Sequence, residues 1–138
     1  MYKEDVDLAW RLRNFGWNAV YVPTAYSYHY RSSRQAENFR FQAIRKNRQS
    51  RSPLANFYSY RNHGAVMLKN DFFTNALLHL PIIWAYELAK FAYVVAFEPR
   101  LIFAIPAFLS RMPRFLRKRF YIIKKARVRP EEIREWMK

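Results

Sequence analysis

The chain has 138 residues, a formal net charge of +15 and no cysteine. It is therefore limited to one ordinary domain, and disulfide frameworks and thiolate metal sites are excluded. The excess positive charge gathers in two segments, residues 31–61 and 111–138, whose net charges are +7 and +8. Either segment would attract a polyanion, whether a nucleic acid, an anionic lipid surface or a phosphorylated substrate.

Three acids at the start of this basic chain accompany the first predicted helix, over residues 5–16. We expect Asp5 to cap this helix, and Glu4 to lie favourably at its positive end. We expect Gly16 to end this helix, because the residue just after a helix commonly has a left-handed backbone conformation. Its buried side should consist of apolar residues at helical spacing, namely Val6, Leu8, Leu12 and Phe15.

Two short β-prone runs follow, Ala19–Val22 and Ala25–Tyr28, joined through Pro23. A basic helix is predicted over residues 35–48. A second, better signalled helix starts where Ser52 supplies an N-cap and the following proline supplies the first helical residue.

Residues 72–109 form an apolar segment with four formal charges. Its longest charge-free stretch, residues 72–86, is shorter than the roughly 20 residues that span a bilayer, and Pro81 interrupts it. A simple transmembrane helix is therefore disfavoured. Glu87, Lys90 and Glu98 fall on one narrow helical stripe, so the rest of that helix is apolar and suited to lipid or a partner protein. The alternative is a buried core helix.

The C-terminal part is predicted to form a basic amphipathic helix over residues 108–126. Such a helix lies in the headgroup plane of a membrane with its cations near an anionic leaflet. The alternative is a solvated basic face over a small core. A short helix is expected to begin at Pro130, because two acids follow in its first turn.

The run KEDVDLAWRLRNFGWNAVYVPTAYSYHYRSS resembles the distal catalytic segment of inverting family 2 glycosyltransferases with the GT-A fold, especially rhamnosyltransferase-like members. The pattern of that family is E-D-x-D-L-x-x-R, then G-(W/Y), then V-x-x-P and finally a histidine, and residues 2–33 are similar to it in this order. The basic and apolar remainder resembles in character the membrane-associated C-terminal tails of these enzymes.

The resemblance implies roles for individual residues. Asp5 would be the general base, Glu4 its acidic neighbour, and Arg11 the arginine of the motif on the substrate side. His29 would complete the coordination of a divalent cation, Mg²⁺ or Mn²⁺, on the donor diphosphate. Asp7 is expected to orient the helix. The implied partners are a nucleotide-sugar donor, with rhamnose as one possible sugar, and a glycan or lipid-linked acceptor.

The family binds its donor through an N-terminal α/β half with an Asp-X-Asp metal motif, and this sequence lacks such a half. We therefore expect a fragment, inactive by itself, that is mainly α with a small β remnant: the C-terminal part of a GT-A α/β glycosyltransferase plus amphipathic membrane-associated helices. Its expected place is the cytoplasmic face of a membrane, as a peripheral or monotopic protein in cell-wall or polysaccharide synthesis.

Four segments are expected: residues 1–33 from the catalytic domain, a basic helical region over 34–70, an apolar membrane-associated region over 71–110, and basic amphipathic helices over 111–138. Two other functions remain open. A non-catalytic module that binds an anionic membrane surface would explain the tail. A basic nucleic-acid binder would explain the charge but not the apolar segment of residues 72–109. The chain has no recognisable nucleic-acid-binding motif, so no nucleic-acid partner is expected.

Overall fold

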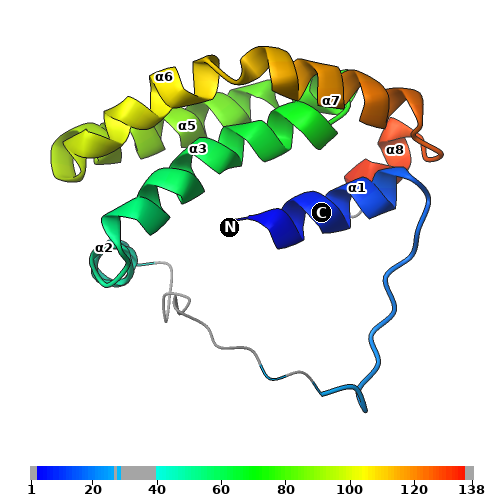
Figure 1. Ribbon diagram of the computed structural model, residues 1–138, viewed down its shortest axis with the longest axis horizontal. Helices are drawn as coiled ribbons and strands as arrows, with labels where there is room; N and C mark the ends of the chain where they lie inside the picture. The colour runs from blue at the N-terminus through cyan, green and yellow to red at the C-terminus, as the bar shows by residue number, and fades with distance from the viewer. Residues whose placement is uncertain (1–2, 27, 29–39, 136–138) are drawn as a thin grey trace.

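The computed structural model describes residues 3–26, 28 and 40–135, and this part of the chain is mainly helical (Figure 1). Its helices are α1 (Glu4–Asn14), α2 (Phe41–Gln49), α3 (Pro53–Asn70), α4 (Phe73–Leu78), α5 (Leu80–Phe97), the 3₁₀ helix η1 (Pro99–Phe103), α6 (Ala104–Leu109), α7 (Met112–Lys124) and α8 (Pro130–Glu135). The prediction of a mainly α chain is therefore confirmed.

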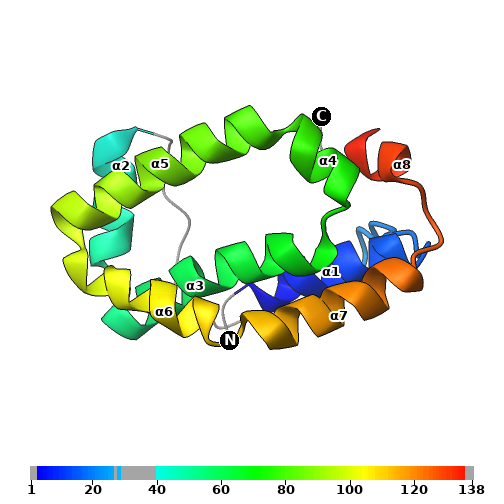
Figure 2. The same cartoon turned by 90° about the horizontal axis from the view of Figure 1, so that it is seen from above.

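Helix α3 is the central element of the fold. Helices α6 and α7 lie along it, and α1 packs against both α3 and α7. Figure 2 shows α5 on the side of α3 that is opposite to α6 and α7. Helix α5 is linked to α4 at one end and, through η1, to α6 at the other. Helix α8 returns to pack on α4, where Ile133 is buried.

Proline and capping residues mark the starts of helices α3 and α5. The Ser52 side chain accepts a hydrogen bond from the Ala55 N–H at 3.1 Å, which caps α3, and Pro53 is its first residue. Pro81 lies in the first turn of α5, directly after the short helix α4. If α4 continued through Pro81, the proline ring would clash with the backbone carbonyl group four residues earlier. The predicted interruption at Pro81 is confirmed.

The predicted helix over residues 108–126 is instead two helices, α6 and α7. Residues Ser110 and Arg111 separate them, and Pro113 then lies in the first turn of α7. In one continuous helix, the Pro113 ring would clash with the Leu109 carbonyl, and a hydrogen bond would be lost. The single-helix expectation was wrong because it disregarded this proline.

The start of α1 differs from the prediction. Its N-cap is Lys3, which has the left-handed value φ 67°, so Asp5 is the second helical residue and does not cap the helix. The Lys3 amino group lies 2.8 Å from Nδ1 of His63 on α3, a contact that accompanies a helix start two residues earlier than expected. The helix ends as predicted, because Gly16 directly follows its last turn with φ 83°.

The side of α1 that packs on α3 is polar rather than apolar. Val6, Leu8 and Leu12 were expected to be buried, yet each is 42–52% exposed. The contact is made instead by Asp7 and the fully buried Asn14, whose amide nitrogen donates to the Asn70 carbonyl at 2.8 Å. Hydrophobic spacing therefore identified the wrong face of α1.

The predicted β remnant forms no strand among the described residues 3–26, 28 and 40–135. Residues 17–22 are irregular, and Val20 and Tyr21 are 82% and 87% exposed. A β-prone run becomes a strand only when a neighbouring strand satisfies its backbone groups, and this segment has no such neighbour in the described part. The second run includes residue 27, and the predicted helix over 35–48 includes residues 35–39; these positions lie outside the described residues.

Helix α2 is held against the far end of α5 by cations and rings. The Phe41 ring lies 5.9 Å and 5.6 Å, centroid to centroid, from those of Tyr93 and Phe97, and Arg45 lies 4.9 Å from the Phe97 ring. The Arg48 guanidinium donates to Glu98. Arg45 and Arg48 therefore make contacts within the fold.

Candidate functional site

The first turn of α1 presents two exposed acids. Glu4 and Asp5 lie at the helix N-terminus, where the unpaired N–H groups and the helix dipole favour carboxylates. One carboxylate oxygen of Asp5 accepts the Val6 N–H at 2.9 Å. Because the Asp5 side chain remains exposed, its carboxylate is accessible to an incoming hydroxyl group.

Asp7 has a different environment from the two acids before it. Its carboxylate accepts hydrogen bonds from Nζ of Lys69 and Nδ2 of Asn70, both at 2.7 Å, and lies 3.4 Å from the Arg11 guanidinium. Burial by itself raises the pKa of the Asp7 carboxyl, but the hydrogen bonds from Lys69 and Asn70 outweigh burial and hold the pKa below its ordinary value. Asp7 therefore fixes α1 on the C-terminal end of α3.

Arg11, expected on the substrate side, does not lie beside Asp5. Six residues separate them on one helix, which corresponds to about 9 Å along the axis and about 120° around it. Arg11 instead pairs with Asp7 and lines a hollow of about 510 Å³ between α1, α3 and α7.

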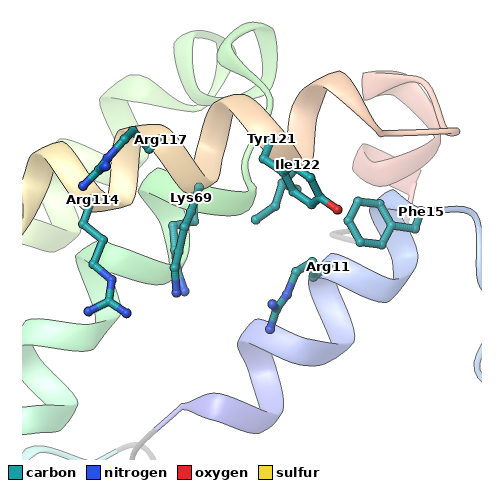
Figure 3. Close-up of a pocket in the computed structure, with 8 residues that line it drawn as sticks. Arg11, Phe15, Lys69, Arg114, Arg117, Tyr121 and Ile122 are labelled. Carbon is teal, nitrogen blue, oxygen red and sulfur yellow. The ribbon is translucent and has the colours of Figure 1, made fainter.

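This basic hollow carries five cationic side chains on three helices (Figure 3). Its lining consists of Arg11, Phe15, Lys69, Arg114, Arg117, Lys118, Tyr121 and Ile122. Figure 3 shows Phe15 and Tyr121 closing one end, with Lys69 and Arg114 toward the other. Sequence reasoning gave the net charge of the segment, but it could not show that α1 and α3 each add a cation to α7.

His29, the expected cation ligand, lies outside the described residues, so its relation to Asp5 stays a prediction. Within residues 3–26, 28 and 40–135, no group of three or more His, Cys, Asp or Glu side chains could hold a metal ion. The described residues do not by themselves form a site for a divalent cation.

Sequence reasoning missed a second polar cluster, between α3 and α5. His63 Nε2 lies 3.1 Å from a carboxylate oxygen of Glu87, and Lys90 Nζ lies 2.6 Å from the same oxygen. The Lys3 amino group approaches the other nitrogen of His63 at 2.8 Å. Glu87 and Lys90 were correctly placed on one stripe of their helix, but only the tertiary structure brings His63 and Lys3 to it.

Glu87 is the acid to which His63 and Lys90 bind in this cluster. Burial by itself raises the pKa of the Glu87 carboxyl, but hydrogen bonds from His63 and Lys90 outweigh it and lower the pKa to about 2. Burial lowers the pKa of the Lys90 ammonium group and also that of Lys3, whose pKa the Lys90 charge lowers further. The cluster ties the apolar helix α5 and the start of α1 to α3.

The outer surface of α5 is apolar, and no other described part of the chain covers it. Its exposed side chains include Ile82, Trp84, Tyr86, Leu88 and Val95. In the described part of the chain, Leu80–Phe97 is the one helix long and apolar enough to cross a membrane by length and composition, with mean hydropathy 1.4. Large exposed apolar surfaces are typical of regions that contact lipid or another protein.

No family model, curated protein or solved structure matches this chain.

Proposed function

We propose that the chain is the acceptor-side, C-terminal part of an inverting glycosyltransferase of family 2, rhamnosyltransferase-like, in which Asp5 is the general base. The observation that carries this proposal is the division of the three acids in the motif. Asp7 is committed to Lys69 and Asn70, whereas the carboxylate of Asp5 is exposed at the helix N-terminus. A structural acid is expected to be paired, as Asp7 is, and a general base is expected to be accessible, as Asp5 is.

The chemistry needs one base. The Asp5 carboxylate takes the proton of an acceptor hydroxyl while the hydroxyl oxygen attacks the anomeric carbon of the sugar. The bond from that carbon to the nucleotide diphosphate breaks, and the diphosphate leaves with the electron pair. The new glycosidic bond forms on the opposite face of the ring, so the configuration inverts without a covalent enzyme intermediate. Glu4 is the second exposed carboxylate on the same turn.

The segment after α1 supports this proposal. Val20, Tyr21 and Tyr26 are each more than four-fifths exposed, which is unusual for β-branched and aromatic side chains. Such a run is suited to add backbone hydrogen bonds and ring contacts to the sheet of a donor-binding half. The half-exposed apolar side chains of α1, Val6 and Leu8, offer a further surface for the same partner.

The place of action proposed here is the cytoplasmic surface of a membrane, with α5 lying in the interface. The cluster of His63, Glu87 and Lys90 holds one side of α5 toward α3, which leaves its apolar sides for lipid. The acceptor is then a glycan or a lipid-linked sugar held at that surface, and the donor is a soluble nucleotide-sugar.

The test is reconstitution with a donor-binding half from a family 2 enzyme, supplied by fusion or as a second chain. Transfer of sugar from a nucleotide-diphosphate rhamnose should appear, and Asp5→Asn should lower the rate by about 10²- to 10⁴-fold. Glu4→Gln is the matched control on the same turn and should retain most of the activity. Folding should be unchanged in both variants, because neither residue is the N-cap.

Near-full turnover of Asp5→Asn together with loss of turnover in Glu4→Gln would assign the base to Glu4. A second candidate function, a non-catalytic membrane-surface module, is favoured by the exposed apolar surface of α5. It would replace the first if reconstituted preparations bind vesicles but transfer no sugar.

A further inference from the structure

The basic hollow between α1, α3 and α7 has an excess of positive charge that the fold does not neutralise. Lys69 and Arg11 share the Asp7 carboxylate, at 2.7 and 3.4 Å. Arg114, Arg117 and Lys118, in contrast, have no acidic partner within the part of the chain that the structure describes. Cations gathered around one concavity repel one another, and an anion seated among them would remove this repulsion.

Two neighbouring cations on α7 contact aromatic side chains. The Lys125 amino group lies 4.5 Å from the centre of the Tyr121 ring and 2.8 Å from its hydroxyl oxygen. The Lys124 amino group lies over the Phe120 ring at 5.9 Å. These two lysines lie outside the lining of the hollow. Of the cations on α7, Arg114, Arg117 and Lys118 are the ones that line the hollow.

We propose that this hollow binds a phosphate monoester or diphosphate group. Guanidinium groups match phosphate oxygens with pairs of parallel N–H donors, and Arg11, Arg114 and Arg117 provide three of them. Lys69, whose side chain is 12% exposed, adds a fixed charge at the α3 wall. A volume of about 510 Å³ accommodates a diphosphate together with part of the group attached to it.

The surroundings accept both a free phosphate and the headgroup of a phospholipid. Phe15 and Tyr121 line one end of the hollow with apolar surface. This site is independent of the chemistry proposed for Asp5, so it can be tested on the 138-residue chain without a donor-binding half.

The experiment compares two double variants of equal charge. Arg114→Gln/Arg117→Gln removes two cations of the hollow, and Lys124→Gln/Lys125→Gln removes two cations of the same helix outside it. Binding of inorganic pyrophosphate is measured by calorimetry. Binding to phosphatidylcholine vesicles with and without phosphatidic acid is measured by co-sedimentation. The arginines are exposed, so both variants should fold, and far-UV circular dichroism checks this.

The arginine variant should bind its ligand at least about tenfold more weakly than the native chain, because charge-assisted hydrogen bonds are lost. The lysine variant should remain within about threefold of the native chain, since screening limits the effect of charges outside the site. Pyrophosphate binding identifies a free phosphate ligand, and binding only to phosphatidic acid vesicles identifies a lipid headgroup. Equal weakening in the two variants, or no binding of either probe by the native chain, would overturn the proposal.

Discussion

The contacts between Asp7 and α3 allow the effect of Asp7→Asn on the free energy of unfolding to be predicted. Asp7 faces three hydrogen-bond donors, those of Lys69, Asn70 and Arg11. In Asp7→Asn, one oxygen remains an acceptor, but the new amide nitrogen must point at another donor. Lys69 then keeps its charge at a largely buried place without a carboxylate.

The magnitude follows from these contacts. A hydrogen bond to a charged group contributes about 1.5–3 kcal/mol, and the asparagine retains one of the two short bonds. Because the Asp7 side chain is 16% exposed, water relieves part of the loss. We expect the free energy of unfolding to fall by about 2 kcal/mol, which for a chain of this size lowers Tm by about 4–8 °C.

Thermal and urea unfolding of the 138-residue chain, followed by far-UV circular dichroism, measure this loss. Asp5→Asn is the matched control, with the same chemical change on the same helix at an exposed side chain, and it should change stability by less than about 0.5 kcal/mol. Adding Lys69→Met to Asp7→Asn should recover about 1 kcal/mol or more, because the uncompensated charge is removed. Equal effects of Asp5→Asn and Asp7→Asn would show that this ion pair does not hold α1.

Two further predictions concern pH and lipid. The pKa of Glu87 in the folded chain is lowered to about 2 from its ordinary 4.5, so the stabilisation from His63 and Lys90 is complete above about pH 4.5 and disappears as the pH falls toward 2. The free energy of unfolding, measured as a function of pH, should show this decline in the native chain and a flatter profile in Glu87→Gln. Trp84→Glu should weaken binding to phosphatidylcholine vesicles by about tenfold, because the 58% exposed indole ring loses its burial in lipid, whereas Gln42→Glu, a control of the same charge change on α2, should bind like the native chain.

Local chemistry in the sequence determined the helix boundaries where a proline, a cap or a glycine acts within one turn. Ser52, Pro81 and Pro130 each mark a helix start at or next to the residue where the structure has it, and Gly16 marks an end. These effects depend on backbone geometry and on hydrogen bonds within the turn, so they do not need the rest of the chain. Pro113 carried the same information, and the predicted helix over residues 108–126 failed because it was not used.

The sequence also placed Glu87 and Lys90 on one side of a helix, but it could not say what that side meets. Only the tertiary structure decided that His63 and Lys3 complete this cluster, and that Asp7 binds Lys69 across 62 positions of sequence. The basic hollow arises in the same way. Hydrophobic periodicity records which side chains avoid water, whereas partners of polar side chains are set by how whole helices pack, and that information is distributed over residues far apart in the chain.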